Sequence, residues 1–233
     1  MADRLAQSIT TILFDVGNTL HHLDHAFIAH TMTRHGHAVQ PSTVAVAEYA
    51  GKAAVDAEFR ARRSGLDATR QLSYFATILD ALQVPAAAAE AILGDLHAEN
   101  TRASLWRVMD PETPQLIREL RERGYTLAVV SNADGRVAAS LAASGIAGEF
   151  VTIVDSHVVG VEKPAARIFE IAMEACRAQP ATTLYVGDIY EIDVRGARNA
   201  GISPVLLDPL GCYGEVDCPR IAALSQLLDL LPR

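Results

Sequence analysis

Two acidic residues in this sequence lie at or just beyond the ends of apolar segments. Asp15 comes after the apolar run 12–14, and Asp188 comes two residues after the run Thr183–Val186. A carboxylate at position 15 can meet a substrate. Mg²⁺ takes one or two carboxylates together with water and substrate phosphate oxygens, so the acidic residues at 187–193 would suit it. A purely structural role is the alternative, because Asp15, and likewise Asp193, could cap a helix that follows.

Three other polar segments extend this pattern. After Asp15, residues 17–19 can present backbone N–H groups to an anion. Ser131 and Asn132 end another apolar segment, where a hydroxyl can hydrogen-bond a phosphoryl oxygen or cap the next helix. Lys163 precedes Pro164, which suits the first turn of a helix. Since Lys52 is the other lysine of the chain, lysine chemistry has two candidate positions.

Short apolar runs rich in β-branched residues predict the strands that carry these groups. The expected strands are Thr10–Phe14, Tyr125–Val130, Phe150–Val154, Thr183–Val186 and Pro204–Leu207, and the expected helices include Pro114–Arg123, Ala165–Ala178 and Asp193–Ala200. This alternation implies right-handed crossovers and an α/β fold with a doubly wound, Rossmann-like parallel sheet. Ligands bind such a sheet at the carboxyl ends of its strands, where the polar residues lie.

About a hundred residues separate the first two strands, far more than one crossover needs. From roughly His22 to Leu105 the sequence is typical of helices broken by glycine and proline. The expected helices are Ala26–His35, Thr43–Arg63, Thr69–Leu82 and Ala86–Arg102. The sequence therefore predicts an inserted α-helical domain.

Composition restricts the class of protein. The chain has 233 residues, a formal net charge of −8 and 50% hydrophobic residues, which is typical of a globular protein. A nucleic-acid backbone binder needs a basic excess, and no apolar run approaches the ~20 residues that span a bilayer. We therefore expect a cytoplasmic protein that binds neither nucleic acid nor a membrane, with free thiols at Cys176, Cys212 and Cys218.

Four motifs occur in a fixed order along the chain. They are Asp-x-Gly-Asn-Thr-Leu at 15–20, Ser-Asn at 131–132, Glu-Lys-Pro at 162–164 and Gly-Asp-x4-Asp at 187–193. Together they resemble the motifs of the haloacid dehalogenase-like (HAD) hydrolase superfamily, and the helical insertion is similar to its C1-type cap. The resemblance covers nearly the whole chain. It implies a core of residues 1–21 and 106–233 and a helical C1 cap domain at 22–105.

The resemblance implies a phosphatase, a phosphoric monoester hydrolase that acts on a small phosphorylated metabolite. Asp15 would be the nucleophile and would form an aspartyl-phosphate that water then hydrolyses. Ser131 and Lys163 would complete the catalytic set. The transferring phosphoryl group would be bound by Ser131 and Lys163 together with the backbone amides around Asn18 and Asn132, so loss of Lys163 should be severe.

A metal site is also implied by the resemblance. Mg²⁺ would be held by Asp15, the backbone carbonyl of Gly17 and Asp188, where it neutralises charge between two anions. Asp193 would lie beside this site and order a metal-bound water or Lys163. We expect EDTA to abolish turnover.

Gly17 departs from the family pattern. Phosphatases of the superfamily usually carry a second Asp at this position, as general acid and base, and such help is worth ~10²–10⁴ in rate. The chain is therefore expected to be a slow phosphatase, to recruit another group, or to have changed reaction. His21 and His22 could supply a proton at neutral pH, or could be hinge or surface histidines.

Two alternatives to a phosphatase are open. A haloacid dehalogenase-type hydrolase also uses an Asp nucleophile but works without Mg²⁺ and without the acidic Gly-Asp motif, so Gly187 and Asp188 favour the phosphatase. A catalytically weak HAD-like binding protein is favoured by Gly17, whereas the retained Asp15, Lys163 and Asp188 count against it.

Substrate identity is expected to reside in the cap. Polar cap residues that could face the active site are His30, His35, His37, Arg60, Arg62, Arg63 and Arg70, and the expected hinge segments are His22–His25 and Arg102–Asp110. The expected assembly is a monomer or a weak homodimer.

Overall fold

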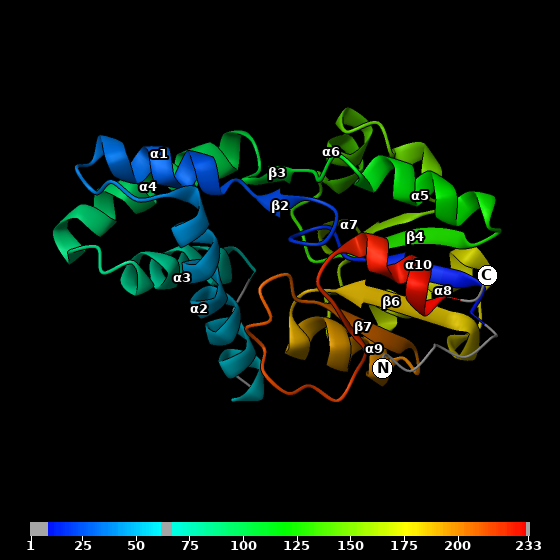
Figure 1. Cartoon of the computed structure of the whole chain (residues 1–233). Helices are drawn as coiled ribbons and strands as arrows, with labels where there is room; N and C mark the ends of the chain where they lie inside the picture. Colours follow the sequence, from blue (N-terminus) through cyan, green and yellow to red (C-terminus); the bar gives the residue numbers. More distant parts are fainter. Residues whose placement is uncertain (1–8, 62–66, 232–233) are drawn as a thin grey trace. The chain divides into compact units, whose positions relative to one another are not determined.

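A computed structural model describes residues 9–61 and 67–231 of the chain. The chain forms two compact units: the α/β unit, Met1–His22 with Met109–Arg233, and the helical unit, Leu23–Val108. The chain crosses from one unit to the other after His22 and after Val108. The short strands at these two crossings, β2 (His22–Leu23) and β3 (Trp106–Val108), form a two-stranded sheet (Figure 1).

A six-stranded parallel sheet forms the centre of the α/β unit. Its spatial order is β5 (Ile153–Asp155), β4 (Thr126–Ser131), β1 (Thr11–Phe14), β6 (Thr183–Gly187), β7 (Ser203–Leu207) and β8 (Arg220–Ile221). Phe14 of β1 lies opposite Val129 of β4 and Val186 of β6. This register brings Asp15, Ser131 and Asp188 to the same carboxyl edge of the sheet.

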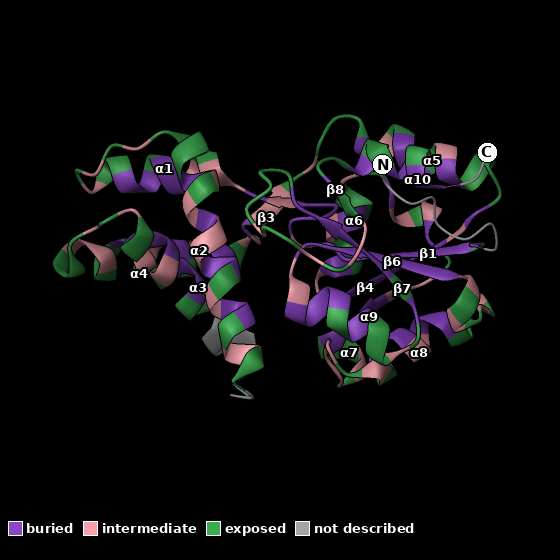
Figure 2. Cartoon of the chain, turned by 60° about the horizontal axis from the view of Figure 1, so that its bottom comes forward, coloured by how far each residue is buried: buried purple, intermediate pink, exposed green. Residues whose placement is uncertain are grey.

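Alternate side chains of the central strands bury against different helices. On one face, Ile12 and Phe14 join a core with α5 (Thr113–Glu122), α6 (Val137–Ala143) and α10 (Leu227–Leu230). On the other, Leu13 and Tyr185 pack with α8 (Ala166–Cys176) and α9 (Arg195–Asn199). The four central strands, β4, β1, β6 and β7, are buried almost throughout (Figure 2). The doubly wound α/β fold predicted from the apolar runs is confirmed.

Local structure around Asp193 differs from the expected helix Asp193–Ala200. Residues Tyr190–Val194 form a single π-helical turn, η3, and α9 starts only at Arg195. Asp193 is not an N-cap, because its carboxylate turns back and accepts the N–H groups of Asp188 and Ile189. Further short elements are η1 (Ala147–Glu149), α7 (Ser156–Val159), η2 (Pro180–Thr182) and η4 (Leu224–Gln226).

Four helices build the helical unit: α1 (His25–Arg34), α2 (Pro41–Arg60), α3 (Asp67–Ala81) and α4 (Ala86–Arg102). Asp24 caps α1 by accepting the N–H of Phe27, and its carboxylate also pairs with Arg107. Pro41 occupies the first turn of α2, where its missing N–H costs nothing. No helix in the described ranges is long and apolar enough to cross a bilayer.

A buried polar network lies between α1, α2 and α3. Glu48 of α2 is 4% exposed; His25 contacts its carboxylate at 2.7 Å, and the Tyr74 hydroxyl donates to it at 2.7 Å. Lys52, one turn later on α2, is also buried and lies 4.8 Å from the ring centre of Tyr49. Burial opposes ionisation of Glu48, but His25, Lys52 and Tyr74 together lower its pKa. Glu48 is therefore held as a buried carboxylate.

Candidate active site

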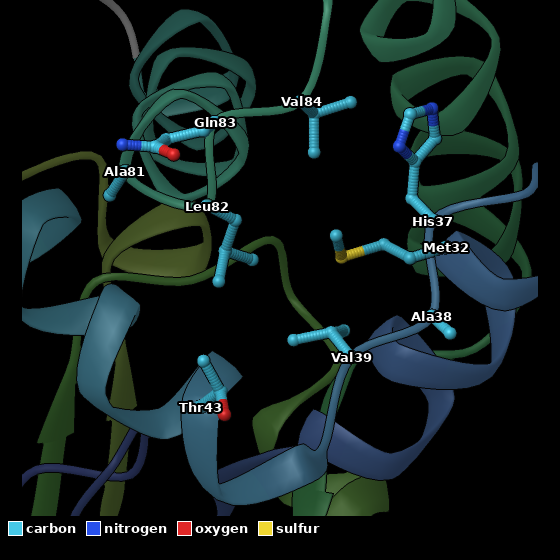
Figure 3. A pocket seen from close by; sticks show the side chains of 9 residues that line it. All are labelled: Met32, His37, Ala38, Val39, Thr43, Ala81, Leu82, Gln83 and Val84. Atoms are coloured by element: carbon cyan, nitrogen blue, oxygen red, sulfur yellow. The ribbon is translucent and has the colours of Figure 1, made fainter.

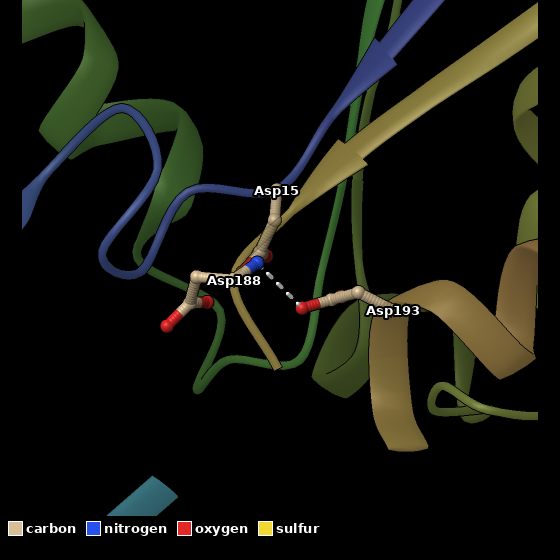
Figure 4. A group of neighbouring side chains, drawn as sticks. All are labelled: Asp15, Asp188 and Asp193. Atoms are coloured by element: carbon tan, nitrogen blue, oxygen red, sulfur yellow. Dashed lines mark hydrogen bonds between the residues drawn. The ribbon is translucent and has the colours of Figure 1, made fainter. Parts of the chain in front are cut away.

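Three buried carboxylates converge at the carboxyl edge of the sheet. Asp15 follows β1, Asp188 follows β6 and Asp193 lies in η3, and each offers an oxygen within 4.8 Å of the others (Figure 4). Carboxylates this close repel each other unless cations separate them. An all-oxygen donor set suits a hard divalent cation such as Mg²⁺, so these residues fit a metal site.

Asp193 shapes the loop that carries Asp188. One carboxylate oxygen of Asp193 accepts the N–H groups of Asp188 at 3.0 Å and Ile189 at 2.9 Å. Gly187 permits this approach, because a Cβ at position 187 would overlap the carboxyl group of Asp193. Gly187 is therefore required by packing, because the Asp193 carboxylate lies directly against the backbone at this position.

Lys163 is the cation between these carboxylates. It is 1% exposed, and its Nζ lies 2.8 Å from Asp15 Oδ1 and 2.7 Å from Asp193 Oδ1. It also donates to the Tyr185 hydroxyl at 2.8 Å, so its three N–H groups have three acceptors. Burial disfavours the ammonium, but the charges of Asp15 and Asp193 outweigh burial and raise the pKa of Lys163.

For Asp15, in contrast to Lys163, the surroundings favour the neutral form over the charged form. Burial raises its pKa, the Lys163 ammonium lowers it, Asp193 raises it again, and the net direction is upward. A second cation beside Asp15 would favour its ionised, nucleophilic form.

Tyr185 is a member of this site that the sequence did not indicate. It lies in the middle of β6, is fully buried, and its hydroxyl is 3.0 Å from Asp193 Oδ1 and 3.1 Å from the Val130 carbonyl. Burial and then the charges of Asp193 and Asp15 raise its pKa, so it stays a neutral phenol. An aromatic residue in an apolar strand is typical of a hydrophobic core, so the sequence pattern around Tyr185 does not indicate a site residue. The one feature that could have indicated it is the hydroxyl group, because a buried hydroxyl needs a hydrogen-bond partner.

Asn132 holds the backbone of Lys163. Its side-chain oxygen accepts the Lys163 N–H at 2.7 Å, and its Nδ2 donates to the Lys163 carbonyl at 3.0 Å. The Asn132 side chain is therefore engaged with the Lys163 backbone, whereas the expected phosphate-binding groups are the backbone amides around Asn132. Ser131 is buried at the end of β4, beside Asp155 of β5.

In the loop after Asp15, two N–H groups that were expected to face an anion form hydrogen bonds within the loop instead. Asn18 has a left-handed backbone, with φ of 52°, and its N–H donates to the His21 carbonyl at 2.7 Å. The N–H of Thr19 donates to the Val16 carbonyl at 3.2 Å. The expectation that both N–H groups face an anion is therefore corrected, because the tight loop closes through them.

The polar residues of the helical unit that were expected to face the active site lie in different environments. His35 pairs with Asp95 at 2.9 Å, whereas His30 and Arg60 are exposed. Arg62 and Arg63 lie outside the described residues, as does the side chain of Arg70. His37 lines a cavity of about 300 Å³ within the helical unit, together with apolar side chains of α1, α3 and the adjoining loops (Figure 3). This cavity contains none of the acidic residues of the site.

Comparison with known proteins identifies the family. The model of the haloacid dehalogenase-like hydrolases matches residues 9–201. The chain belongs to the haloacid dehalogenase-like hydrolases. A human member, haloacid dehalogenase-like hydrolase domain-containing protein 3, is 31% identical over 250 aligned positions, which cover 100% of this chain and 95% of that protein. The superfamily predicted from the four motifs is confirmed.

Two further proteins extend the comparison. A glyceraldehyde 3-phosphate phosphatase of Methanothermobacter thermautotrophicus is 35% identical over 148 residues, or 60% of this chain and 65% of that protein, just under two thirds of its length. The magnesium-bound crystal structure of YfnB from Bacillus subtilis aligns with a TM-score of 0.69, 21% identity and coverage of 97% and 99% of the two chains. This structural likeness shows a shared fold.

Proposed function

We propose that this HAD-like hydrolase is a Mg²⁺-dependent phosphatase that acts through an aspartyl-phosphate on Asp15. One observation carries the proposal: Asp15 lies at one sheet edge with the second carboxylate Asp188 and the buried ammonium of Lys163. A carboxylate nucleophile, an acidic metal site and a fixed cation are the groups that phosphoryl transfer to a carboxylate needs.

The metal would be held by Asp15, Asp188 and the backbone carbonyl of Gly17. When bound, it would neutralise the charge between the Asp15 carboxylate and an approaching phosphate. Asp193 would not need to bind the metal itself, since its carboxylate is already engaged with Lys163 and with the N–H groups of Asp188 and Ile189. It would act by orienting both neighbours.

The proposed reaction has two displacements at phosphorus. A carboxylate oxygen of Asp15 attacks phosphorus, and the bond from phosphorus to the substrate oxygen breaks. Water then attacks the aspartyl-phosphate, which releases inorganic phosphate and restores Asp15. The Ser131 hydroxyl would bind a phosphoryl oxygen in both steps, and Lys163 would do so by exchanging its contact with Asp15 for a phosphoryl oxygen. Because Gly17 has no proton to give, the leaving oxygen takes its proton from water, and we expect slow turnover.

A small phosphorylated metabolite is the proposed substrate class. The similarity to a glyceraldehyde 3-phosphate phosphatase supports it, and so does a catalytic centre made of buried side chains. We propose that the helical unit acts as a C1-type cap that selects the substrate, with hinges at His22–His25 and Arg102–Asp110. We further propose a cytoplasmic protein that works as a monomer or a weak homodimer.

The test is a screen of small phosphate monoesters with Mg²⁺, followed by the Asp15→Asn variant. We expect phosphate release by the wild type, its loss after exhaustive chelation, and its loss in Asp15→Asn with unchanged circular dichroism. Undiminished turnover in purified Asp15→Asn would refute the nucleophile assignment. Halide release from 2-haloacids in the presence of EDTA would instead support a dehalogenase.

A further inference from the structure

His21 is a buried histidine with both ring nitrogens engaged. It is 1% exposed, its Nδ1 lies 3.0 Å from Ser140 Oγ, and its Nε2 lies 2.8 Å from Ser144 Oγ. The two serines are one helical turn apart, in α6 and directly after it. A ring held in this way is closed to a substrate, so His21 is not the proton donor that could replace an acid at Gly17.

The backbone of His21 closes the loop that follows the nucleophile. Its carbonyl accepts the N–H of Asn18 at 2.7 Å, and its N–H donates to the Val16 carbonyl at 2.8 Å. Val16 is the residue next to Asp15. The conformation of the loop at 15–21 therefore depends on where His21 is fixed, and its ring fixes it to α6.

The opposite end of α6 is anchored to the phosphate-binding side of the proposed site. The loop from Ser131 to α6 is held by β5 and α7: Gly135 donates its N–H to Asp155 at 2.9 Å, and Ala133 donates its N–H to Ser156 Oγ at 3.0 Å. One short helix thus connects to the loop after Asp15 at one end and to the loop after Ser131 at the other.

We propose that His21 is a positioning residue that clamps the nucleophile loop 15–21 to α6, and so sets the place of Asp15 relative to the loop that begins at Ser131. The importance for catalysis of the position of Asp15 relative to this loop rests on the proposed function. The clamp itself does not, because it is a property of the loop and can be measured without a substrate.

The chemistry of the three side chains suits a clamp. A neutral imidazole donates from one nitrogen and accepts at the other, and a serine hydroxyl can do either, so both contacts form with either tautomer. Burial, and then the neighbouring His22, lowers the pKa of His21, which favours this neutral form.

Hydrogen exchange of the backbone amides tests the clamp. The variants are His21→Phe, which keeps a ring of similar size without hydrogen bonds, and the double variant Ser140→Ala with Ser144→Ala. We expect the amides of residues 18–21 to exchange at least about tenfold faster in both variants, while amides of β6 keep their rates. Ser225→Ala, which removes an exposed serine hydroxyl elsewhere in the α/β unit, is the matched control.

Steady-state kinetics with the best phosphate ester of the screen then tests the consequence. We expect kcat to fall about tenfold in the double serine variant with KM changed less than about twofold, because displaced reacting groups slow the chemical step. His21→Asn, whose amide can still reach one serine, should recover part of kcat relative to His21→Phe.

Each other result has a defined meaning. Unchanged exchange of residues 18–21 in the double serine variant would overturn the clamp, even if His21→Phe were unstable. Faster exchange with unchanged kcat would overturn the positioning role. A wild-type protein without phosphatase activity would refute the proposed function, while the exchange rates would still decide the clamp.

Discussion

Lys163 shows how single side chains shape this site. An ammonium at 1% exposure is costly unless acceptors replace its water, and Asp15, Asp193 and Tyr185 supply three. Two of these acceptors are charged, and the third is the only neutral one. The neutral acceptor can be removed without creating an unpaired buried charge, so Tyr185 is the residue at which the geometry of Lys163 can be tested.

Tyr185→Phe removes the hydroxyl and keeps the ring, which packs edge-to-face on Phe169 at 4.9 Å. We expect a loss of about 1–2 kcal/mol in the free energy of unfolding, since Lys163 loses an acceptor and the Val130 carbonyl loses a donor. We also expect kcat to fall about tenfold as Lys163 becomes less fixed. Urea unfolding and initial rates measure the two effects.

Tyr125→Phe is the control, because Tyr125 directly precedes β4, at the end of that strand away from Ser131. It should leave kcat unchanged. A Tyr185→Phe variant that is less stable but fully active would show that the hydroxyl serves folding alone.

Gly17→Asp tests the missing proton donor. Gly17 is not among the glycines with a left-handed backbone, where a side chain would be strained. We expect kcat on an alkyl phosphate to rise about 10²-fold, because the new carboxyl group can protonate a poor leaving group. With p-nitrophenyl phosphate, whose leaving group needs no proton, the gain should be less than about threefold. Equal gains on both substrates would argue against acid catalysis at this position.

At the scale of elements, the strands of the sheet were predictable because burial on both faces makes each one a continuous apolar run. The observed β1, β4, β6 and β7 lie within a residue of the expected ends. The two-residue strands were not predictable, since so short a segment has no periodicity. The π-turn η3 was also missed, because it depends on Asp193 reaching back to the N–H groups of Asp188 and Ile189.

The candidate site divides in the same way. Asp15, Ser131 and Asp188 could be found because they are polar residues at or just beyond the ends of apolar strands. Lys163 could be found from the Glu-Lys-Pro motif and because the chain has only two lysines. Tyr185 fits an apolar strand, and the link from His21 to α6 joins residues more than a hundred positions apart. Contacts of this kind depend on tertiary structure, which a single sequence does not reveal.

Helix α2 carries a buried carboxylate whose ionisation supports the helical unit. Glu48→Gln should lower the free energy of unfolding at pH 7 by about 1–3 kcal/mol, because the charged hydrogen bonds to His25 and Tyr74 are weakened and Lys52 loses a counter-charge. The ordinary pKa of this carboxyl group is 4.5, and its folded pKa is lower. Its stabilisation is therefore fully present above pH 4.5 and is lost as the pH falls through the folded pKa.

Thermal melts of the wild type and Glu48→Gln between pH 3 and pH 7 measure this difference. The two Tm values should differ most at neutral pH and converge in acid. Glu58→Gln, on the same helix but more exposed, is the control and should change Tm little. A difference that is constant across the pH range would show that the ionisation of Glu48 contributes nothing.

For the whole molecule, the net charge of −8 and the scarcity of lysine have structural counterparts. Each unit holds one of the two lysines, and both are buried beside carboxylates: Lys163 in the α/β unit and Lys52 in the helical unit. The lysines therefore serve as internal counter-charges. In the α/β unit, three carboxylates lie together and the Lys163 ammonium contacts two of them, which leaves an excess of negative charge where an anionic substrate is proposed to bind.

This excess leads to a stability prediction for the complete chain. Without metal, Asp188→Asn should melt at a higher temperature than the wild type, since it removes repulsion among the three carboxylates. With Mg²⁺ at 100 times its Kd, the wild type should gain about 2.7 kcal/mol and become the more stable protein, while Asp188→Asn gains far less. Asp229→Asn, which neutralises an exposed carboxylate on α10, should respond to Mg²⁺ like the wild type.

Melting curves of the wild type, Asp188→Asn and Asp229→Asn with EDTA and across a Mg²⁺ titration measure these differences. An equal rise in Tm for Asp188→Asn would place the metal elsewhere, whereas a reversal of the order of stability would tie the metal to Asp188 without any assay of activity.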